Sequence, residues 1–166
     1  EGRFHLETDI REPQLVSWKG QLHLFFAVLG TDPAAFEPGG SRHALYNGPD
    51  DWTEPEEIFE DDFIPWRIKE IGGQLSLVGY TGGGSVYDPA NSEPIRVRWL
   101  TSDDGVTWSP TVVGKEVVYQ GGASETDLVV RADGSVIGVI RNEAGDEGGF
   151  GSKICRAEPG APADWQ

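Results

Sequence analysis

Residues 19–26 read KGQLHLFF, residues 72–78 read GGQLSLV, and residues 133–140 read DGSVIGVI. Each stretch is a turn followed by an apolar strand, and a shorter apolar stretch precedes each turn. The turn glycines Gly20, Gly73 and Gly134 are 53 and 61 residues apart. Glycine supplies the positive φ that a tight hairpin turn needs. The pattern therefore predicts three hairpins, each forming the first two strands of one repeat.

A tryptophan recurs with the same period. Trp52, Trp108 and Trp165 are 56 and 57 residues apart, and each follows a candidate third strand. These third strands are expected at 41–46, 95–100 and 151–156. Fourth strands are expected at 56–60 and 111–119, whereas the chain reaches Gln166 where the third unit would begin its fourth strand.

Two markers with one period, within the roughly 40 to 60 residues of a four-stranded blade, predict a β-propeller. We expect an all-β chain of antiparallel blades over residues 1–166: blade 1 at about 9–60, blade 2 at about 61–119 and an incomplete blade 3 at about 120–166. Residues 3–8 would be an outer strand of a preceding blade or would fill the vacancy in the third. The alternative is a non-repetitive β-sandwich with similar hairpins.

Composition supports the all-β prediction and excludes some partners. The 166 residues include 23 Gly and 11 Pro, which suits short strands joined by tight turns. The formal charge of −15 disfavours nucleic acid and anionic membrane surfaces, and no apolar stretch approaches the roughly 18 residues of a membrane span. The one cysteine, Cys155, forms no internal disulfide and is expected to be a small buried residue.

The stretch TSDDGVTW, residues 101–108, has the pattern Ser/Thr-x-Asp-x-Gly-x-Thr-Trp. It resembles the Asp-box of the sialidase-like propellers, which implies a structural turn formed by Thr101, Asp103, Gly105, Thr107 and Trp108. The Asp would accept backbone N–H bonds, the Gly would supply positive φ, and the Trp would pack beneath the hairpin. The equivalent stretches 45–52 and 158–165 keep the Trp but are degenerate.

No metal or cofactor site is expected. The acidic pairs at 50–51 and 103–104 lack the spaced oxygen ligands and the closing Glu of an EF-hand loop.

Propeller ligands usually bind where the innermost strands begin, at the mouth of the central channel. The charged and aromatic residues expected there are Arg11, Glu12, Trp66, Arg67, Glu125, Asp127 and Arg141. Carboxylates at this position suit acid/base catalysis and arginines suit an anionic sugar. We therefore take Glu125, Asp127 and Glu12 as candidate catalytic residues, and Arg11, Arg67, Arg141 and Trp66 as candidate ligand-binding residues. The plainer interpretation is that these charges pair with each other or are solvated.

The resemblance to sialidases implies an arginine triad, a Tyr nucleophile with a Glu partner, and an acid/base Asp. Arg67 is similar to the first triad arginine, although Lys69 stands where that motif has a proline; Arg11 and Arg141 would complete the triad, and Glu125 would assist the Tyr. No tyrosine falls at the start of an inner strand. Two functions remain open: a glycan-directed glycoside hydrolase, and a non-catalytic propeller that binds carbohydrate or protein.

The partners expected are a glycan or small molecule at the channel. A second copy of the chain or the remainder of a longer chain would complete the ring, because an open arc exposes apolar blade faces. The resemblance favours a secreted or periplasmic location.

Overall fold

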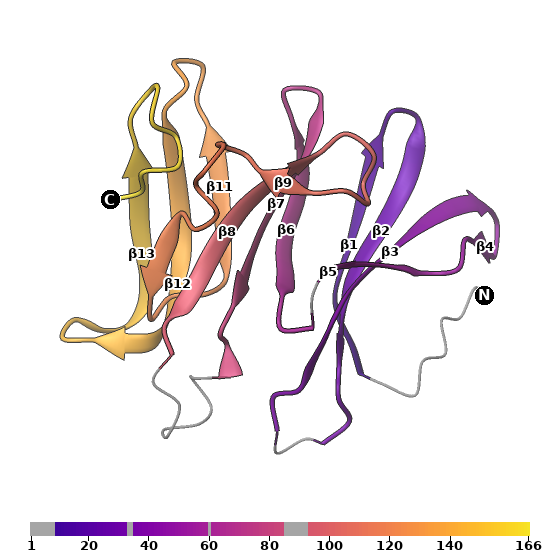
Figure 1. The fold of residues 1–166 in the computed structure, drawn as a ribbon, viewed down its shortest axis with the longest axis horizontal. Coiled ribbons are helices and arrows are strands. Elements are labelled where there is room, and N and C mark those ends of the chain that lie inside the picture. The colour runs from indigo at the N-terminus through magenta and orange to yellow at the C-terminus, as the bar shows by residue number, and fades with distance from the viewer. Residues whose placement is uncertain (1–8, 33–34, 60, 85–92) are drawn as a thin grey trace.

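The computed structural model describes residues 9–32, 35–59, 61–84 and 93–166. Three antiparallel sheets stand side by side in chain order (Figure 1). The all-β prediction is confirmed. The predicted strand within residues 3–8 lies outside the described residues.

The first sheet contains β1 (Asp9–Trp18), β2 (Gln21–Leu29), β3 (Pro38–Gly48), β4 (Asp51–Trp52) and β5 (Glu56–Phe59). β1 pairs with β2 and β2 with β3, whereas β4 and β5 both pair with β3. The β1–β2 turn has positive φ at two successive residues, Lys19 (48°) and Gly20 (78°). This is the type I′ geometry that matches the twist of a hairpin.

The second sheet contains β6 (Ile64–Ile71), β7 (Gln74–Thr81), β8 (Ile95–Ser102), β9 (Ser109–Pro110) and β10 (Tyr119–Gly121). Its order is β10-β8-β7-β6, with β9 also paired to β8. The expected fourth strand over 111–119 is shorter and later, because a turn closed by the bond from Lys115 N to Val112 O occupies part of this segment. β10 therefore crosses the blade boundary that we expected near residue 119.

The third sheet has three strands, β11 (Thr126–Val130), β12 (Val136–Asp146) and β13 (Gly149–Ala157). Gln166 lies beside β13 and exchanges two backbone hydrogen bonds of 2.9 Å with Arg156. The recurring tryptophans behave alike in the second and third sheets: the indole N–H of Trp108 donates to Gly105 O, and that of Trp165 to Pro162 O, each three residues earlier.

Two apolar clusters join the sheets. The one between the first and second sheets is built on Trp18, Phe25, Phe63, Ile68, Leu75, Leu77 and Leu100. The other extends across to the third sheet through Trp99, Leu128, Val136, Ala157 and Ala163. Burial of these side chains is the main term that holds the sheets together.

Side chains also connect the inner strands β1, β6 and β11 directly. Gln14 on β1 donates to Pro65 O at 3.2 Å and to Trp66 O, and accepts from Ile68 N at 2.7 Å. Lys69 on β6 donates to Leu128 O at 2.7 Å. These bonds satisfy backbone groups that no neighbouring strand reaches, and they set the spacing of the three strands.

The turn at 102–108 is closed by Asp104 rather than by Asp103. Asp104 Oδ1 accepts from Val106 N at 2.8 Å, from Thr107 N at 2.7 Å and from the Ser102 hydroxyl at 3.0 Å. These bonds lower the pKa of Asp104 to about 2. Gly105 has φ 86°, whereas Asp103 accepts from the Gln74 side chain at 3.1 Å.

We expect Asp104→Ala to lower the free energy of unfolding by about 1 kcal/mol, because three donors lose a charged acceptor at an exposed site. Asp103→Ala is the matched control and should change stability by less than about half of that. Urea unfolding at pH 7 measures both. Equal losses in the two variants would contradict the assignment of the turn to Asp104.

A buried histidine pair lies where the first sheet meets this turn. His23 on β2 and His43 on β3 are 4% and 3% exposed, and His23 Nδ1 is 2.9 Å from His43 Nε2. His43 also stacks on Phe25, with ring centroids 4.6 Å apart. Burial, followed by the neighbouring His23, lowers the pKa of His43 to about 4, so the ring is neutral at pH 7.

We expect stability to fall as the pH drops from about 6.5 towards 4, by up to about 3 kcal/mol. The unfolded chain takes up the proton near pH 6.5, whereas folded His43 takes it up only near pH 4; stability is therefore full above pH 6.5 and lost below it. His43→Gln should flatten this dependence in urea unfolding at pH 7, 5.5 and 4.5. Parallel profiles for the two proteins would contradict it.

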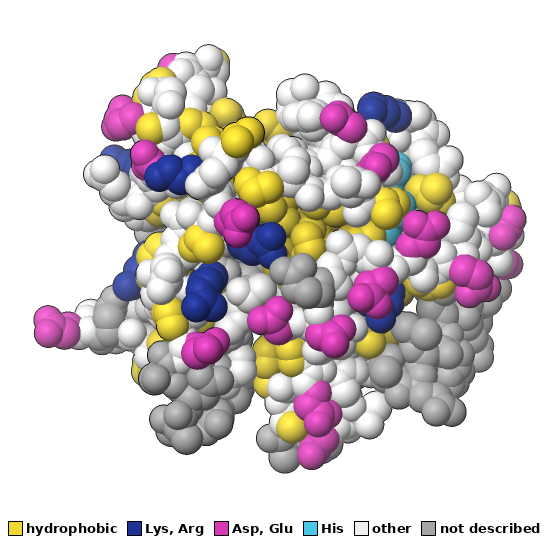
Figure 2. Space-filling model, in the orientation of Figure 1, with side chains coloured by type: hydrophobic (Ala, Val, Ile, Leu, Met, Phe, Trp, Pro, Cys, Tyr) yellow, Lys and Arg dark blue, Asp and Glu magenta, His cyan; other side chains and the backbone are white. Residues whose placement is uncertain are grey.

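The outward face of the third sheet carries exposed apolar side chains: Val129 is 56%, Val139 48% and Ile154 64% exposed. Other surfaces carry the acidic excess, and Figure 2 shows Asp and Glu side chains spread over the face in view. Closure of the ring by a second copy or by further chain stays a prediction. The solution mass from light scattering at two protein concentrations tests whether two copies of this chain associate.

Candidate functional site

A pocket of about 350 Å³ lies where the three inner strands begin. It is lined by Arg11 and Glu12 from β1, Trp66 from β6, Glu125 just before β11, and Arg141 from β12. All three sheets therefore contribute to it. Five of the seven residues expected at the channel mouth meet here.

Glu12 enters the pocket because β1 is bulged. Arg11 pairs with Ala27 and Gln14 with Phe25, so Glu12 and Pro13 together oppose one residue of β2. Glu12 has φ 52°, a conformation uncommon for a residue other than glycine. Bulges re-aim side chains and are frequent beside active sites. Pro13, which has no backbone N–H, fits the second position of the bulge because no ladder donor is lost there.

Trp66 occupies a second bulge at the equivalent level of β6. Pro65 pairs with Gly79 and Arg67 with Val78, which leaves Trp66 without an opposite residue. The Gln14 side chain on β1 donates a hydrogen bond to the carbonyl of Trp66, and this bond stabilises the bulge on β6. The half-buried indole thus lies on the wall of the pocket next to Glu12 and Arg11.

Glu125, just before the third inner strand β11, lies at a similar irregularity of the backbone pairing. Arg141 N donates to Glu125 O, and Ser124 N donates to Arg141 O, so Ser124 and Glu125 together face Arg141. The side chains are tied as well: Arg141 Nη1 is 2.7 Å from Glu125 Oε1, and Arg141 Nη2 is 3.3 Å from Glu143 Oε1. Glu143 is 9% exposed and accepts from the Ser124 hydroxyl at 2.6 Å. Arg141 is therefore held between two carboxylates.

The pKa of Glu12 is raised above its ordinary value. Burial is the largest cause and the nearby Glu125 carboxylate adds to it, against the opposing effect of Arg11 and Arg67. A carboxyl group with a raised pKa beside a second carboxylate is the arrangement that separates a proton donor from a charged partner.

Arg67 and Asp127 do not line the pocket. Arg67 Nε is 3.6 Å from Asp127 Oδ2, and Lys69 also bonds to Asp127. These residues connect β6 to β11 beside the site, as in the plainer interpretation that the channel charges pair with each other.

Sequence reasoning missed several residues of the site. Asp32, Phe36 and Tyr80 line the pocket, and Glu143 lies behind Arg141. Tyr80 comes from β7 and is 8% exposed, so it belongs to the apolar wall. A signal for the bulges was present in the sequence, because Pro13 and Pro65 stand inside strands, where proline is found mainly at bulges and edges.

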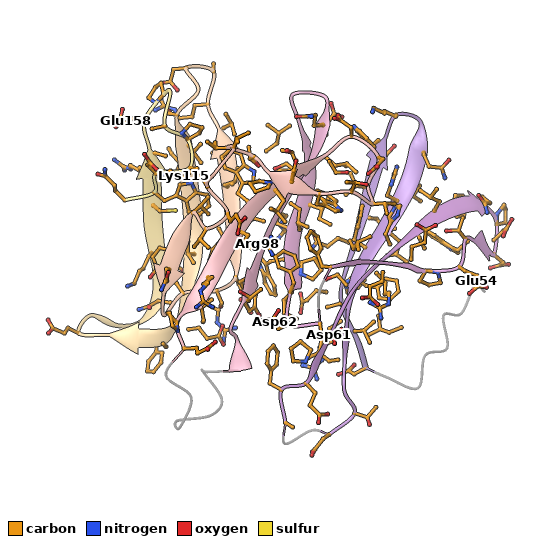
Figure 3. The ribbon with its side chains drawn as sticks, viewed as in Figure 1. Glu54, Asp61, Asp62, Arg98, Lys115 and Glu158 are labelled. Carbon is orange, nitrogen blue, oxygen red and sulfur yellow. The ribbon has the colours of Figure 1, made fainter. Side chains whose placement is uncertain are left out.

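The described residues hold no group of three His, Cys, Asp or Glu side chains placed to bind a metal. In the same parts of the chain, no helix is long and apolar enough to cross a membrane. A second hollow of about 250 Å³ lies beside Asp62 and Arg98, which Figure 3 places before β6 and on β8. Its lining mixes Arg96 and Arg98 with Asp62 and Glu116, and the Arg98 guanidinium lies 5.6 Å from the Phe63 ring centroid.

No family model matches the sequence. No curated protein matches it either. Solved structures do match the fold. An alpha-L-arabinofuranosidase from Lactobacillus brevis aligns with a TM-score of 0.65 and 18% identity over 95% of this chain and 53% of its own.

A xylan beta-1,4-xylosidase from Bacillus halodurans C-125 aligns with a TM-score of 0.57 and 16% identity, over 96% of this chain and 30% of its own. A sialidase aligns with a TM-score of only 0.43 and 12% identity, over 96% of this chain and 21% of its own. The chain spans about half the length of the arabinofuranosidase and less of the others. The likenesses to the arabinofuranosidase and the xylosidase show that this chain has the fold of part of a β-propeller, of the kind found in several glycoside hydrolases.

Proposed function

We propose that the pocket binds a glycan and hydrolyses a glycosidic bond, with Glu12 as proton donor and Glu125 as the second carboxylate. The observation that carries the proposal is the convergence of these two carboxyl groups, from β1 and from the start of β11, in one pocket with an aromatic wall. Glycosidases generally use a pair of carboxyl groups of which one has a raised pKa.

Three features support this assignment. The pKa of Glu12 is raised by burial and by Glu125, which suits a proton donor. Trp66 offers an indole surface on which the apolar face of a sugar ring can stack. The structural likeness is to enzymes named arabinofuranosidase and xylosidase, at identities that establish the fold alone.

The narrower assignment to the sialidase-like group rests on the stretch 101–108 and on the channel arginines. Its hydrogen bonds come from Ser102 and Asp104 where the motif has Thr101 and Asp103, whereas Gly105 and Trp108 keep their places in the turn. The narrower assignment stays a prediction.

Turnover of a panel of aryl glycosides tests the proposal. We expect Glu125→Gln to abolish most of the turnover with retained ligand binding. Asp127→Asn is the matched control: it removes the same charge two residues later, outside the pocket lining, and should keep most of the activity. Absence of turnover by the unmodified chain with every aryl glycoside, or equal loss in both variants, would overturn the assignment.

A non-catalytic module that binds carbohydrate or protein is the second candidate. The observation that favours it is the ion pair between Glu125 and Arg141, which already occupies the second carboxylate. Saturable glycan binding without turnover is the result expected from such a module.

A further inference from the structure

The two arginines of the pocket already contact carboxylates of the chain. Arg11 Nε donates to Asp9 Oδ2 at 2.6 Å. Arg141 has one terminal nitrogen on Glu125 and the other on Glu143. A guanidinium binds a ligand carboxylate best through two parallel N–H bonds. In Arg141 both terminal nitrogens already contact carboxylates of the chain.

The total charge points the same way. Two arginines and three carboxyl groups line the pocket, a formal charge of −1 when all are ionised and of 0 when Glu12 is protonated. Asp9 and Glu143, which contact those arginines, add two negative charges and bring the total to −3 or −2. Arg67 and Lys69, just outside, both contact Asp127, and these three groups together add +1, so the total stays negative. An anionic ligand would therefore meet an excess of negative charge, and at Arg141 it would have to displace a carboxylate of the chain.

A neutral sugar meets none of these obstacles. Its hydroxyls can donate to the carboxylates of Glu12, Glu125 and Asp32, and such charge-assisted bonds are strong. Its apolar ring face fits against the Trp66 indole.

We propose that the ligand of this pocket is an uncharged glycan and that the pocket discriminates against uronic and sialic acids. The inference rests on the proposed function, whose glycan it specifies. It reverses the role expected for Arg11 and Arg141: these side chains position Asp9, Glu125 and Glu143 instead of binding an anionic sugar.

The test measures the binding of matched sugar pairs to the chain by ligand-observed NMR at low salt. Methyl glucoside is compared with methyl glucuronide, and methyl galactoside with methyl galacturonide, so that each pair differs only at C6; N-acetylneuraminic acid is added. We expect at least one neutral member to bind at least tenfold more tightly than its acid partner. The ratio should shrink in high salt, because screening weakens the repulsion.

Asp9→Asn supplies the second measurement. It releases Arg11 from its carboxylate, and we expect affinity for the acid member to rise at least threefold while affinity for the neutral member stays within twofold. Asp51→Asn removes the same charge on β4, outside the pocket, and should change neither.

The outcomes separate this inference from the proposed function. Acid members that bind as tightly as neutral ones, in a chain that turns over glycosides, overturn the inference and leave the hydrolase proposal standing. Tighter binding of the neutral members without turnover overturns the hydrolase proposal and leaves the inference about an uncharged glycan standing. Binding of neither class overturns both.

Discussion

Glu12→Gln should lower kcat on the best aryl glycoside by a factor of about 10² to 10⁴ while leaving the Kd for a non-hydrolysable glycoside within about threefold. The amide keeps the size and polarity of the side chain but has no acidic proton to donate to the leaving group. Steady-state kinetics and ligand-observed NMR measure the two quantities.

The pH profile gives a sharper sign of the same role. Because the pKa of Glu12 is raised, its protonated form persists to higher pH than that of an ordinary glutamate. The rate should therefore fall as the pH rises through this pKa, and Glu12→Gln should lack that limb in its residual activity. Glu158→Gln, on the loop after β13, is the matched control and should keep the full profile. A retained limb in Glu12→Gln would assign the proton donor to another group.

Phe25→Ala should lower the free energy of unfolding by about 3–5 kcal/mol, the largest stability effect that we expect. Phe25 is fully buried and belongs to the cluster that joins the first and second sheets. Its ring stacks on His43 and meets Trp108 edge-on at 6.0 Å. Truncation would leave a cavity beneath the turn at 102–108, between two sheets that both line the pocket.

Leu15→Ala is the control for this variant. Leu15 lies on the neighbouring strand β1 but is 62% exposed, so its loss should change stability by less than about 0.5 kcal/mol. Urea unfolding at pH 7 compares the two. Equal losses would mean that the cluster around Phe25 does not hold the sheets together.

The hairpins were predictable because their signals are local. A turn glycine and an alternating apolar strand lie within a few residues of each other, as at Gly73 and Leu75. The recurrence of a tryptophan with the same period as the hairpins predicted that each hairpin belongs to a longer repeat. The fourth strand of the second sheet was placed too early, since its pairing with β8 depends on where the chain returns and not on its own residues.

The turn at 102–108 shows a finer error of the same kind. The motif contains two adjacent aspartates, and their spacing alone favours Asp103. The backbone turns so that Asp104 faces the free N–H groups, while Asp103 reaches across to Gln74.

For the site, the sequence predicted the level of the channel and five pocket residues, because charged residues recur at the start of every inner strand. It did not separate Arg67 and Asp127, which pair outside the pocket, from Glu12 and Glu125 within it. The bulges on β1 and β6 bring Glu12 and Trp66 into the pocket, and the irregularity before β11 brings in Glu125. A bulge shifts a side chain between faces, and the face it reaches depends on pairing with a strand more than ten residues away.

Local chemistry was thus enough for the strands, the turns and the repeat, since each depends on neighbours in sequence. The charge of the pocket depends on which charged groups β1 and the β11–β12 hairpin bring to it. The ion pairs themselves are local, because Arg11 contacts Asp9 and Arg141 contacts Glu143 on the same strand, and Arg141 contacts Glu125 within one hairpin. Packing of the sheets brings these pairs together in one pocket. Packing is therefore what changes the expectation from an anionic ligand to a neutral one.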